Sequence, residues 1–216
     1  SIGSVSKQFT AFSIYLLQEQ GKLSVEDDIQ KYFPDWPVYS QPIKIKHLLS
    51  HTSGLRDQWG LLTLAGWTME DPITTDQILN LAKRQRSLNF ETGKGFGYSN
   101  TGYTLLAAII SKVSGQTFAA FTSENIFKPL GMMHSRFLED VHQLIPGRAD
   151  SYQKINGVYE TIELNHSNAG PTNLMTTTAD LTRWVNNFDH PIVGSAAMIR
   201  EFNKISLLDN KEPVIW

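Results

Sequence analysis

The spacing of apolar residues along the chain predicts a mostly helical protein. In the segment 8–17, Phe9, Phe12 and Leu16 recur at helical intervals, and Gly21 provides a stop. The same periodicity over 105–113 is again followed by a glycine. Shorter helices are predicted at 24–33, 74–86, 117–131, 178–188 and 195–203, most of them opened by a capping Ser or Thr. In the helix at 178–188 we expect these apolar residues to face the core: Leu181, Trp184, Val185 and Phe188.

Alternating residues indicate little β-structure. The pair Asn156-Gly157 is typical of a type I′ turn and predicts a hairpin over 149–163. A brief extended piece is expected at 43–45. The pattern therefore predicts an α+β protein, with several helices and one hairpin.

The composition restricts the possible functions more than it restricts the possible folds. The 216 residues include 41% hydrophobic and 19% charged residues, with a net charge of −2 and no cysteine. This balance gives no support for nucleic-acid binding, and no stretch is long and apolar enough to span a bilayer. The lack of cysteine excludes disulfides and thiolate metal sites. The composition leaves the oligomeric state open.

The first candidate for chemistry is Ser4-Val5-Ser6-Lys7. A serine and a lysine three apart at the start of a helix lie on one face, where a desolvated amine can take the hydroxyl proton. The alternative interpretation is a capping serine followed by a solvated lysine. A second copy, Ser151 and Lys154, lies in a predicted strand, where residues three apart point to opposite faces.

The second candidate is Tyr98-Ser99-Asn100, which follows the glycine-rich segment 93–97 and precedes the helix over 105–113. A phenol near an ammonium can act as a general base, and an amide can bind both a substrate carbonyl and the lysine. The alternative is a packed tyrosine beside a capping asparagine. His47 and His51 have the spacing of a zinc pair but lack the glutamate of that motif.

Three elements in this order resemble the serine β-lactamase and penicillin-binding-protein superfamily: Ser-Val-Ser-Lys, His-Leu-Leu-Ser-His-Thr-Ser-Gly-Leu at 47–55, and Tyr-Ser-Asn at 98–100. They are most similar to the class C branch, which includes β-lactamases, DD-carboxypeptidases and related esterases. The segment 173–184 also resembles that family. The resemblance implies the family's α+β fold, with this chain supplying mostly the helical domain.

The resemblance also implies roles for individual residues. Ser4 would be the acylated nucleophile, with its backbone N–H as half of an oxyanion hole, and Lys7 would be its proton partner. Tyr98 would act as base and as acid toward the leaving group, and Asn100 would orient the substrate. Gln58 would correspond to a substrate-contacting glutamine. No metal or organic cofactor is implied, and the partner would be a small-molecule or peptide substrate, such as a β-lactam, a D-Ala-type peptide or an ester.

One family motif is missing from these residues. No lysine or histidine is followed by a small residue and then glycine, the triplet that supplies the second oxyanion donor in relatives. We therefore expect residues 1–216 to be a partial domain, without the first strands and without the region of this third motif. The resemblance further implies a periplasmic, secreted or cell-envelope location. Two other functions stay open: a binding or regulatory protein that is acylated without turnover or is silent, and a helical interaction domain.

Overall fold

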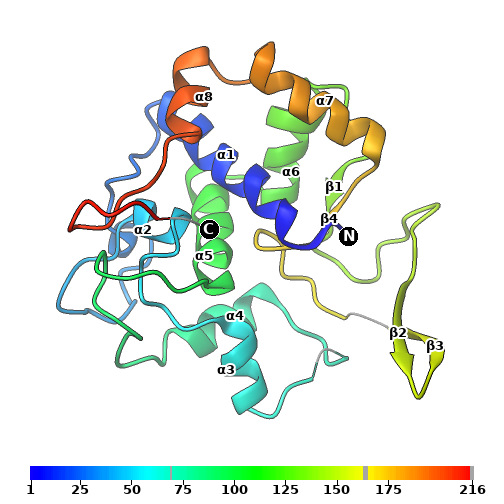
Figure 1. Cartoon of the computed structure of the whole chain (residues 1–216), viewed down its shortest axis with the longest axis horizontal. Helices are drawn as coiled ribbons and strands as arrows, with labels where there is room; N and C mark the ends of the chain where they lie inside the picture. Colours follow the sequence, from blue (N-terminus) through cyan, green and yellow to red (C-terminus); the bar gives the residue numbers. More distant parts are fainter. Residues whose placement is uncertain (69, 163–164, 215–216) are drawn as a thin grey trace.

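The computed structural model describes residues 1–68, 70–162 and 165–214, and its architecture is a cluster of helices around one central helix (Figure 1). The α-helices are α1 (Lys7–Glu19), α2 (Ile45–Leu49), α3 (Gln58–Leu64), α4 (Thr75–Ala82), α5 (Asn100–Ser114), α6 (Phe118–Thr122), α7 (Thr178–Asp189) and α8 (Ala196–Phe202). Short 3₁₀ turns, η1 (Gly3–Ser6) and η2 (Ile29–Lys31), and a π turn, η3 (Ser123–Phe127), complete the helical elements.

Helix α5 is the centre of the fold. Leu105, Leu106, Ile109 and Ile110 are fully buried on it, and α1, α2, α4 and α6 all pack against it. The helix ends where Gly115 takes a left-handed conformation, with φ of +71°, as the sequence predicted. Within the described residues no single helix is long and apolar enough to cross a membrane; α5 and the helical segment 118–127 pass that test only together, as a pair bent by 77°.

An aromatic cluster joins the two ends of the chain. The ring of Trp184 on α7 lies 4.3 Å from that of Phe9 and 4.8 Å from that of Phe12, both on α1. Phe202 on α8 lies 5.5 Å from Phe12. Each buried aromatic contributes on the order of 1.5–3 kcal/mol by leaving water. This packing holds α1 rigidly, and α1 begins with Lys7 of the candidate site. Val185, by contrast, is 60% exposed, so its predicted place in the core was wrong.

The strands form two small antiparallel ladders. Strand β1 (Arg136–Phe137) pairs with β4 (Leu174–Met175), and β2 (Ser151–Ile155) pairs with β3 (Val158–Ile162). The second ladder is the predicted hairpin, and it projects from the helical body (Figure 1). Its turn residues Asn156 and Gly157 have φ of 49° and 87°, as a type I′ turn requires.

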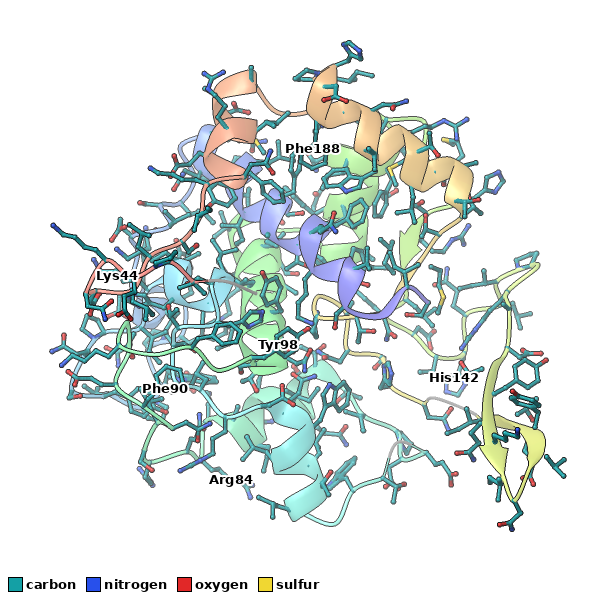
Figure 2. All side chains as sticks on the ribbon, in the orientation of Figure 1. Lys44, Arg84, Phe90, Tyr98, His142 and Phe188 are labelled. Atoms are coloured by element: carbon teal, nitrogen blue, oxygen red, sulfur yellow. The ribbon has the colours of Figure 1, made fainter. Side chains whose placement is uncertain are left out.

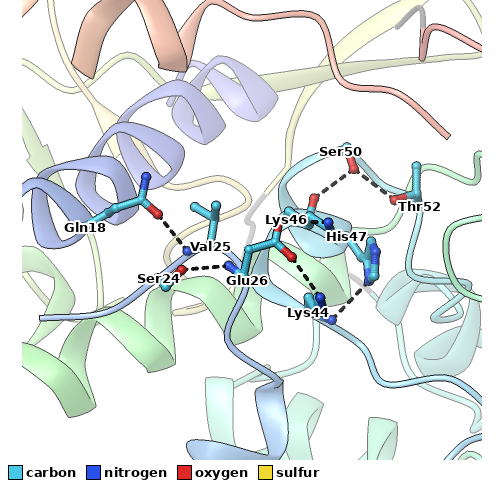
Figure 3. A network of polar contacts seen from close by, with 9 residues as sticks. All are labelled: Gln18, Ser24, Val25, Glu26, Lys44, Lys46, His47, Ser50 and Thr52. Atoms are coloured by element: carbon cyan, nitrogen blue, oxygen red, sulfur yellow. Dashed lines mark hydrogen bonds and ion pairs between the residues drawn. The ribbon is translucent and has the colours of Figure 1, made fainter. Parts of the chain in front are cut away.

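The segment after α1 departs from the prediction. Ser24 does not open a helix, because its hydroxyl accepts from the N–H of Glu26 in a turn (Figure 3). The 3₁₀ turn η2 begins later and is capped by Asp28. Glu26 is instead held outward by ion pairs with Lys44 and Lys46, both at 2.8 Å. Similarly, the predicted extended piece at 43–45 is cut short because α2 starts at its last residue. Helix α4 ends four residues before the predicted end at 86.

Candidate active site

Ser4 and Lys7 lie on one face at the start of α1. Ser4 is exposed within η1, whereas Lys7, the first residue of α1, is only 2% exposed. The two fully buried rings of Phe9 and Phe12 on the next turns anchor the helix, so the amine is held inside the protein. The N–H of Leu174 donates to the hydroxyl of Ser6 at 3.1 Å and ties η1 to β4.

The Lys7 amine has three oxygen partners. Its Nζ lies 3.1 Å from Ser4 Oγ, 2.8 Å from Asn100 Oδ1 and 2.9 Å from the carbonyl oxygen of Pro171. The last two oxygens can only accept hydrogen bonds, whereas a hydroxyl can also donate. A neutral amine that donates its two hydrogens to Asn100 and Pro171 therefore directs its lone pair at the Ser4 hydroxyl.

The electrostatic environment makes that neutral form accessible. Burial lowers the pKa of Lys7 to about 8, and the negative charge of Asp57 opposes this shift. The rings of Tyr98 and Tyr103 lie 4.8 and 5.4 Å from Nζ and present their faces to the amine. At pH 7 about a tenth of Lys7 is consequently neutral and able to accept a proton, far more than for a lysine in water.

The phenol of Tyr98 completes the cluster at Ser4. Its hydroxyl donates to Ser4 Oγ at 2.8 Å, and the side chain lies near the middle of the molecule, just before α5 (Figure 2). The ring packs on that of His51, with centroids 4.4 Å apart. The N–H of Gly97 donates to the carbonyl of His51 at 3.0 Å, and the N–H of Ser99 donates to its Nδ1 at 3.2 Å. His51 therefore holds the loop that presents Tyr98.

His47 and His51, which have the spacing of a zinc pair, both take part in hydrogen bonds. Burial, helped by the positive charge of Lys7, lowers the pKa of His51 to about 4, so the ring is neutral at ordinary pH. The Nδ1 of His47 accepts from the N–H of Lys44 at 3.1 Å. Within the described part of the chain, no group of three or more His, Cys, Asp or Glu residues is placed to hold a metal ion.

The Pro171 carbonyl reaches Lys7 because the chain before it lies directly on α5. Gly170 has φ of +114°, and a Cβ on it would lie 2.7 Å from Ala107 Cβ and 2.8 Å from the carbonyl oxygen of Tyr103. Only glycine fits this approach. The hydroxyl of Thr10 on α1 also donates to the Gly170 carbonyl at 2.7 Å, which fastens the segment between the two helices.

Asn100 is the first residue of α5, and its side chain has one orientation. Oδ1 accepts from Lys7, while Nδ2 donates to Asp57 Oδ1 at 2.8 Å. The structure thus brings together four of the residues predicted for the site, namely Ser4, Lys7, Tyr98 and Asn100. Sequence reasoning missed Asp57 and Pro171. A signal existed for Asp57, an aspartate just before a helix; a backbone carbonyl leaves no signal.

Gln58 lies apart from this cluster. It is 1% exposed, its Nε2 donates to Asn168 Oδ1 at 2.7 Å, and its Oε1 accepts from the hydroxyl of Thr104 at 2.6 Å. A substrate would have to break these hydrogen bonds to reach the amide. The substrate-contacting role of Gln58 stays a prediction that this geometry does not favour.

An open groove runs beside the cluster. It has a volume of about 580 Å³, and its lining includes Ser4, Lys7, Tyr15, Tyr103 and Phe202. The groove gives a small molecule or a peptide end direct access to the Ser4 hydroxyl, and the aromatic and aliphatic side chains in its wall suit an apolar group.

Comparison with known proteins identifies similar molecules. A family model described as Beta-lactamase matches residues 1–209. Penicillin-binding protein 4* of Bacillus subtilis is 41% identical over 152 residues, which cover 70% of this chain and 33% of that protein. A D-aminopeptidase of Brucella anthropi is 33% identical over 139 residues, which cover 64% of this chain and 26% of the relative.

The fold comparison agrees. The solved structure of an octameric penicillin-binding protein homologue from Pyrococcus abyssi superposes with a TM-score of 0.83 at 26% identity, covering 96% of this chain and 49% of that one. The chain spans a third or less of the length of the two curated relatives, at 33% and 26%. Activities of those whole proteins therefore bear on this chain only as hypotheses.

Proposed function

Because the chain belongs to the Beta-lactamase family, we propose that it is a serine hydrolase that works through an acyl-enzyme intermediate. The family includes hydrolases such as the D-aminopeptidase. The observation that carries the proposal is the convergence on Ser4 Oγ of the Lys7 amine at 3.1 Å and the Tyr98 phenol at 2.8 Å. A capping serine with a solvated lysine would need neither contact.

The acylation step follows from these contacts. Neutral Lys7 takes the proton from Ser4 Oγ as the oxygen attacks the substrate carbonyl carbon and forms a tetrahedral adduct. The adduct collapses when its bond to the leaving group breaks, and Tyr98 gives its proton to the departing nitrogen or oxygen. The resulting phenolate is stabilised by the adjacent Lys7 ammonium, whose Nζ lies 4.8 Å from the ring centroid.

Deacylation reverses these roles. The Tyr98 phenolate takes a proton from a water molecule, which attacks the acyl carbonyl, and the Ser4 oxygen leaves with the proton held by Lys7. All three side chains then return to their starting states. Asn100, held against Lys7 at 2.8 Å, keeps the amine aimed at Ser4 through both steps.

For the substrate, we favour an amide or peptide bond next to a D-amino acid, with a β-lactam as its cyclic analogue. The similarity to a D-aminopeptidase and to penicillin-binding protein 4* supports this class. A class C β-lactamase or an esterase is the finer alternative within the family. We further propose a periplasmic, secreted or cell-envelope location, which rests on the family resemblance alone.

The test is covalent labelling. The protein is incubated with a fluorescent penicillin and, separately, with a fluorophosphonate probe, and the adduct is located by peptide mass spectrometry. We expect an adduct on Ser4 that is absent from Ser4→Ala, followed by slow recovery of free protein. Permanent labelling would instead indicate a sensor that is acylated without turnover. Equal absence of labelling in both proteins would refute the proposal.

A further inference from the structure

Asp57 joins the N-termini of two helices at the candidate site. As the residue before α3, it accepts through Oδ2 from the N–H of Trp59 at 3.1 Å. Its Oδ1 accepts from the backbone N–H of Asn100, at the start of α5, at 2.6 Å. One carboxylate therefore satisfies donors of both helices and lies where both helix dipoles favour negative charge.

The same carboxylate determines which way the Asn100 amide points. Oδ1 of Asp57 also accepts from Asn100 Nδ2 at 2.8 Å, which leaves Asn100 Oδ1 facing Lys7. The reverse orientation would place an amide oxygen against the carboxylate and an N–H₂ group against the lysine. The first contact would be repulsive, and the second would repel a Lys7 ammonium or, with a neutral amine, occupy the lone pair that the Ser4 proton needs. The carboxylate thus fixes the acceptor that orients the lysine amine.

Asp57 also acts on the charge of Lys7. The pKa of Lys7 is lowered by burial, and the Asp57 charge opposes that lowering. Around the amine lie the phenols of Tyr98 and Tyr103 and the neutral ring of His51. Across the groove, Tyr15 and Lys204 complete the ionisable lining. Of the groups that act on the Lys7 amine in the described part of the chain, Asp57 is the one that carries a negative charge.

We propose that Asp57 is a positioning residue for acylation, which holds the Asn100 amide in the orientation that aims the Lys7 amine at Ser4. This inference rests on the proposed acyl-enzyme function. It goes beyond that function because Asp57 contacts neither Ser4 nor the groove and acts through Asn100. The loop that carries the carboxylate is thereby part of the catalytic design and not only a connection between helices.

The discriminating variant is Asp57→Ser. A serine hydroxyl caps a helix nearly as well as a carboxylate, so the α3 cap is kept. It is too short to hold the Asn100 amide and carries no charge. We expect a folded protein with a lower thermal unfolding midpoint, because the backbone N–H and the side-chain amide of Asn100 lose their acceptor. We also expect an acylation rate at least about tenfold lower, as misplaced catalytic groups produce. Asp57→Asn, nearly isosteric, is the second variant should serine disturb folding.

A matched control is Asp28→Asn. Asp28 also caps a helical turn, accepting from the N–H of Gln30 at 2.9 Å, but lies outside the candidate site. We expect its acylation rate to equal that of the parent. An Asp57→Ser protein that is folded and acylates at the parental rate would overturn the positioning role.

A readout independent of activity separates this inference from the proposed function. The Lys7 amine is titrated by NMR of the ¹³Cε-labelled side chain in the parent, Asp57→Ser and Asp28→Asn. Loss of the Asp57 charge is expected to lower the Lys7 pKa by about half a unit or more, while Asp28→Asn leaves it in place. An unmoved Lys7 pKa in Asp57→Ser contradicts the inference even if labelling of the parent fails.

Discussion

Replacing Gly170 by alanine tests how closely the chain must approach α5 to build the site. At φ of +114° an L-residue is strained, and its Cβ would lie 2.7 Å from Ala107 Cβ and 2.8 Å from the Tyr103 carbonyl oxygen. Backbone strain of this kind costs about 1–3 kcal/mol. Overpacking against a buried helix adds about 1–3 kcal/mol. We therefore expect Gly170→Ala to lower the free energy of unfolding by about 2–6 kcal/mol.

The matched control is Gly115→Ala. Gly115 also has a positive φ, of +71°, but no atom lies within 4 Å of the position of its Cβ. Its replacement carries the backbone cost alone, about 1–2 kcal/mol. The two free energies of unfolding are measured by urea denaturation followed by circular dichroism. Because relaxation of Gly170→Ala would move the Pro171 carbonyl from Lys7, the acylation rate of that variant is expected to fall as well. Equal destabilisation of the two variants would refute the close-approach argument.

Three further results are expected from the charges and the core. The acylation rate should rise about tenfold per pH unit toward pH 8 and then level off, because Lys7, with a pKa of about 8, must be neutral to accept the serine proton. A flat profile of stopped-flow rates between pH 6 and 9 would contradict this. The free energy of unfolding should fall as the pH drops from 6.5 to 5, by up to about 1.4 kcal/mol per pH unit for each of His47 and His51. Burial lowers the pKa of both rings to about 4 in the folded protein, so the unfolded chain binds the protons first. Urea midpoints across this range measure the fall, and a constant midpoint would be inconsistent with buried neutral rings. Trp184→Ala should cost about 3–5 kcal/mol by emptying the aromatic cluster, whereas Val185→Ala, at a 60% exposed position, should change the urea midpoint little; similar effects of the two would argue against the packing described.

Much of the fold was predictable because local signals and tertiary packing agree. The periodic apolar residues before Gly115 and the turn pair Asn156-Gly157 both specify their elements within a few residues. The family and its α+β fold, predicted from three ordered motifs, are confirmed by the family model and the fold comparison. The helix predicted to begin at Ser24 was wrong because the Ser24 hydroxyl accepts from the N–H of Glu26 in a turn, an outcome that the capping pattern does not exclude.

The candidate site was predictable only in its side chains. Ser4, Lys7, Tyr98 and Asn100 belong to motifs, and the structure links them in one chain of hydrogen bonds, from Tyr98 through Ser4 and Lys7 to Asn100. The carbonyl of Pro171 could not be anticipated, since every residue carries such an oxygen and only the tertiary fold selects one. The reach of Asp57 to a second helix is likewise a property of packing.

The hydrogen bonds of Lys7 make the assembly of the site depend on the folding of the whole chain. Its amine meets Asn100 at a separation of 93 residues and Pro171 at a separation of 164. Closing loops of that length carries an entropic cost that only a nearly complete core repays. Folding intermediates that have native-like helices but lack these long-range contacts would therefore have an unreactive Ser4. The serine becomes reactive only when the last long-range contacts form.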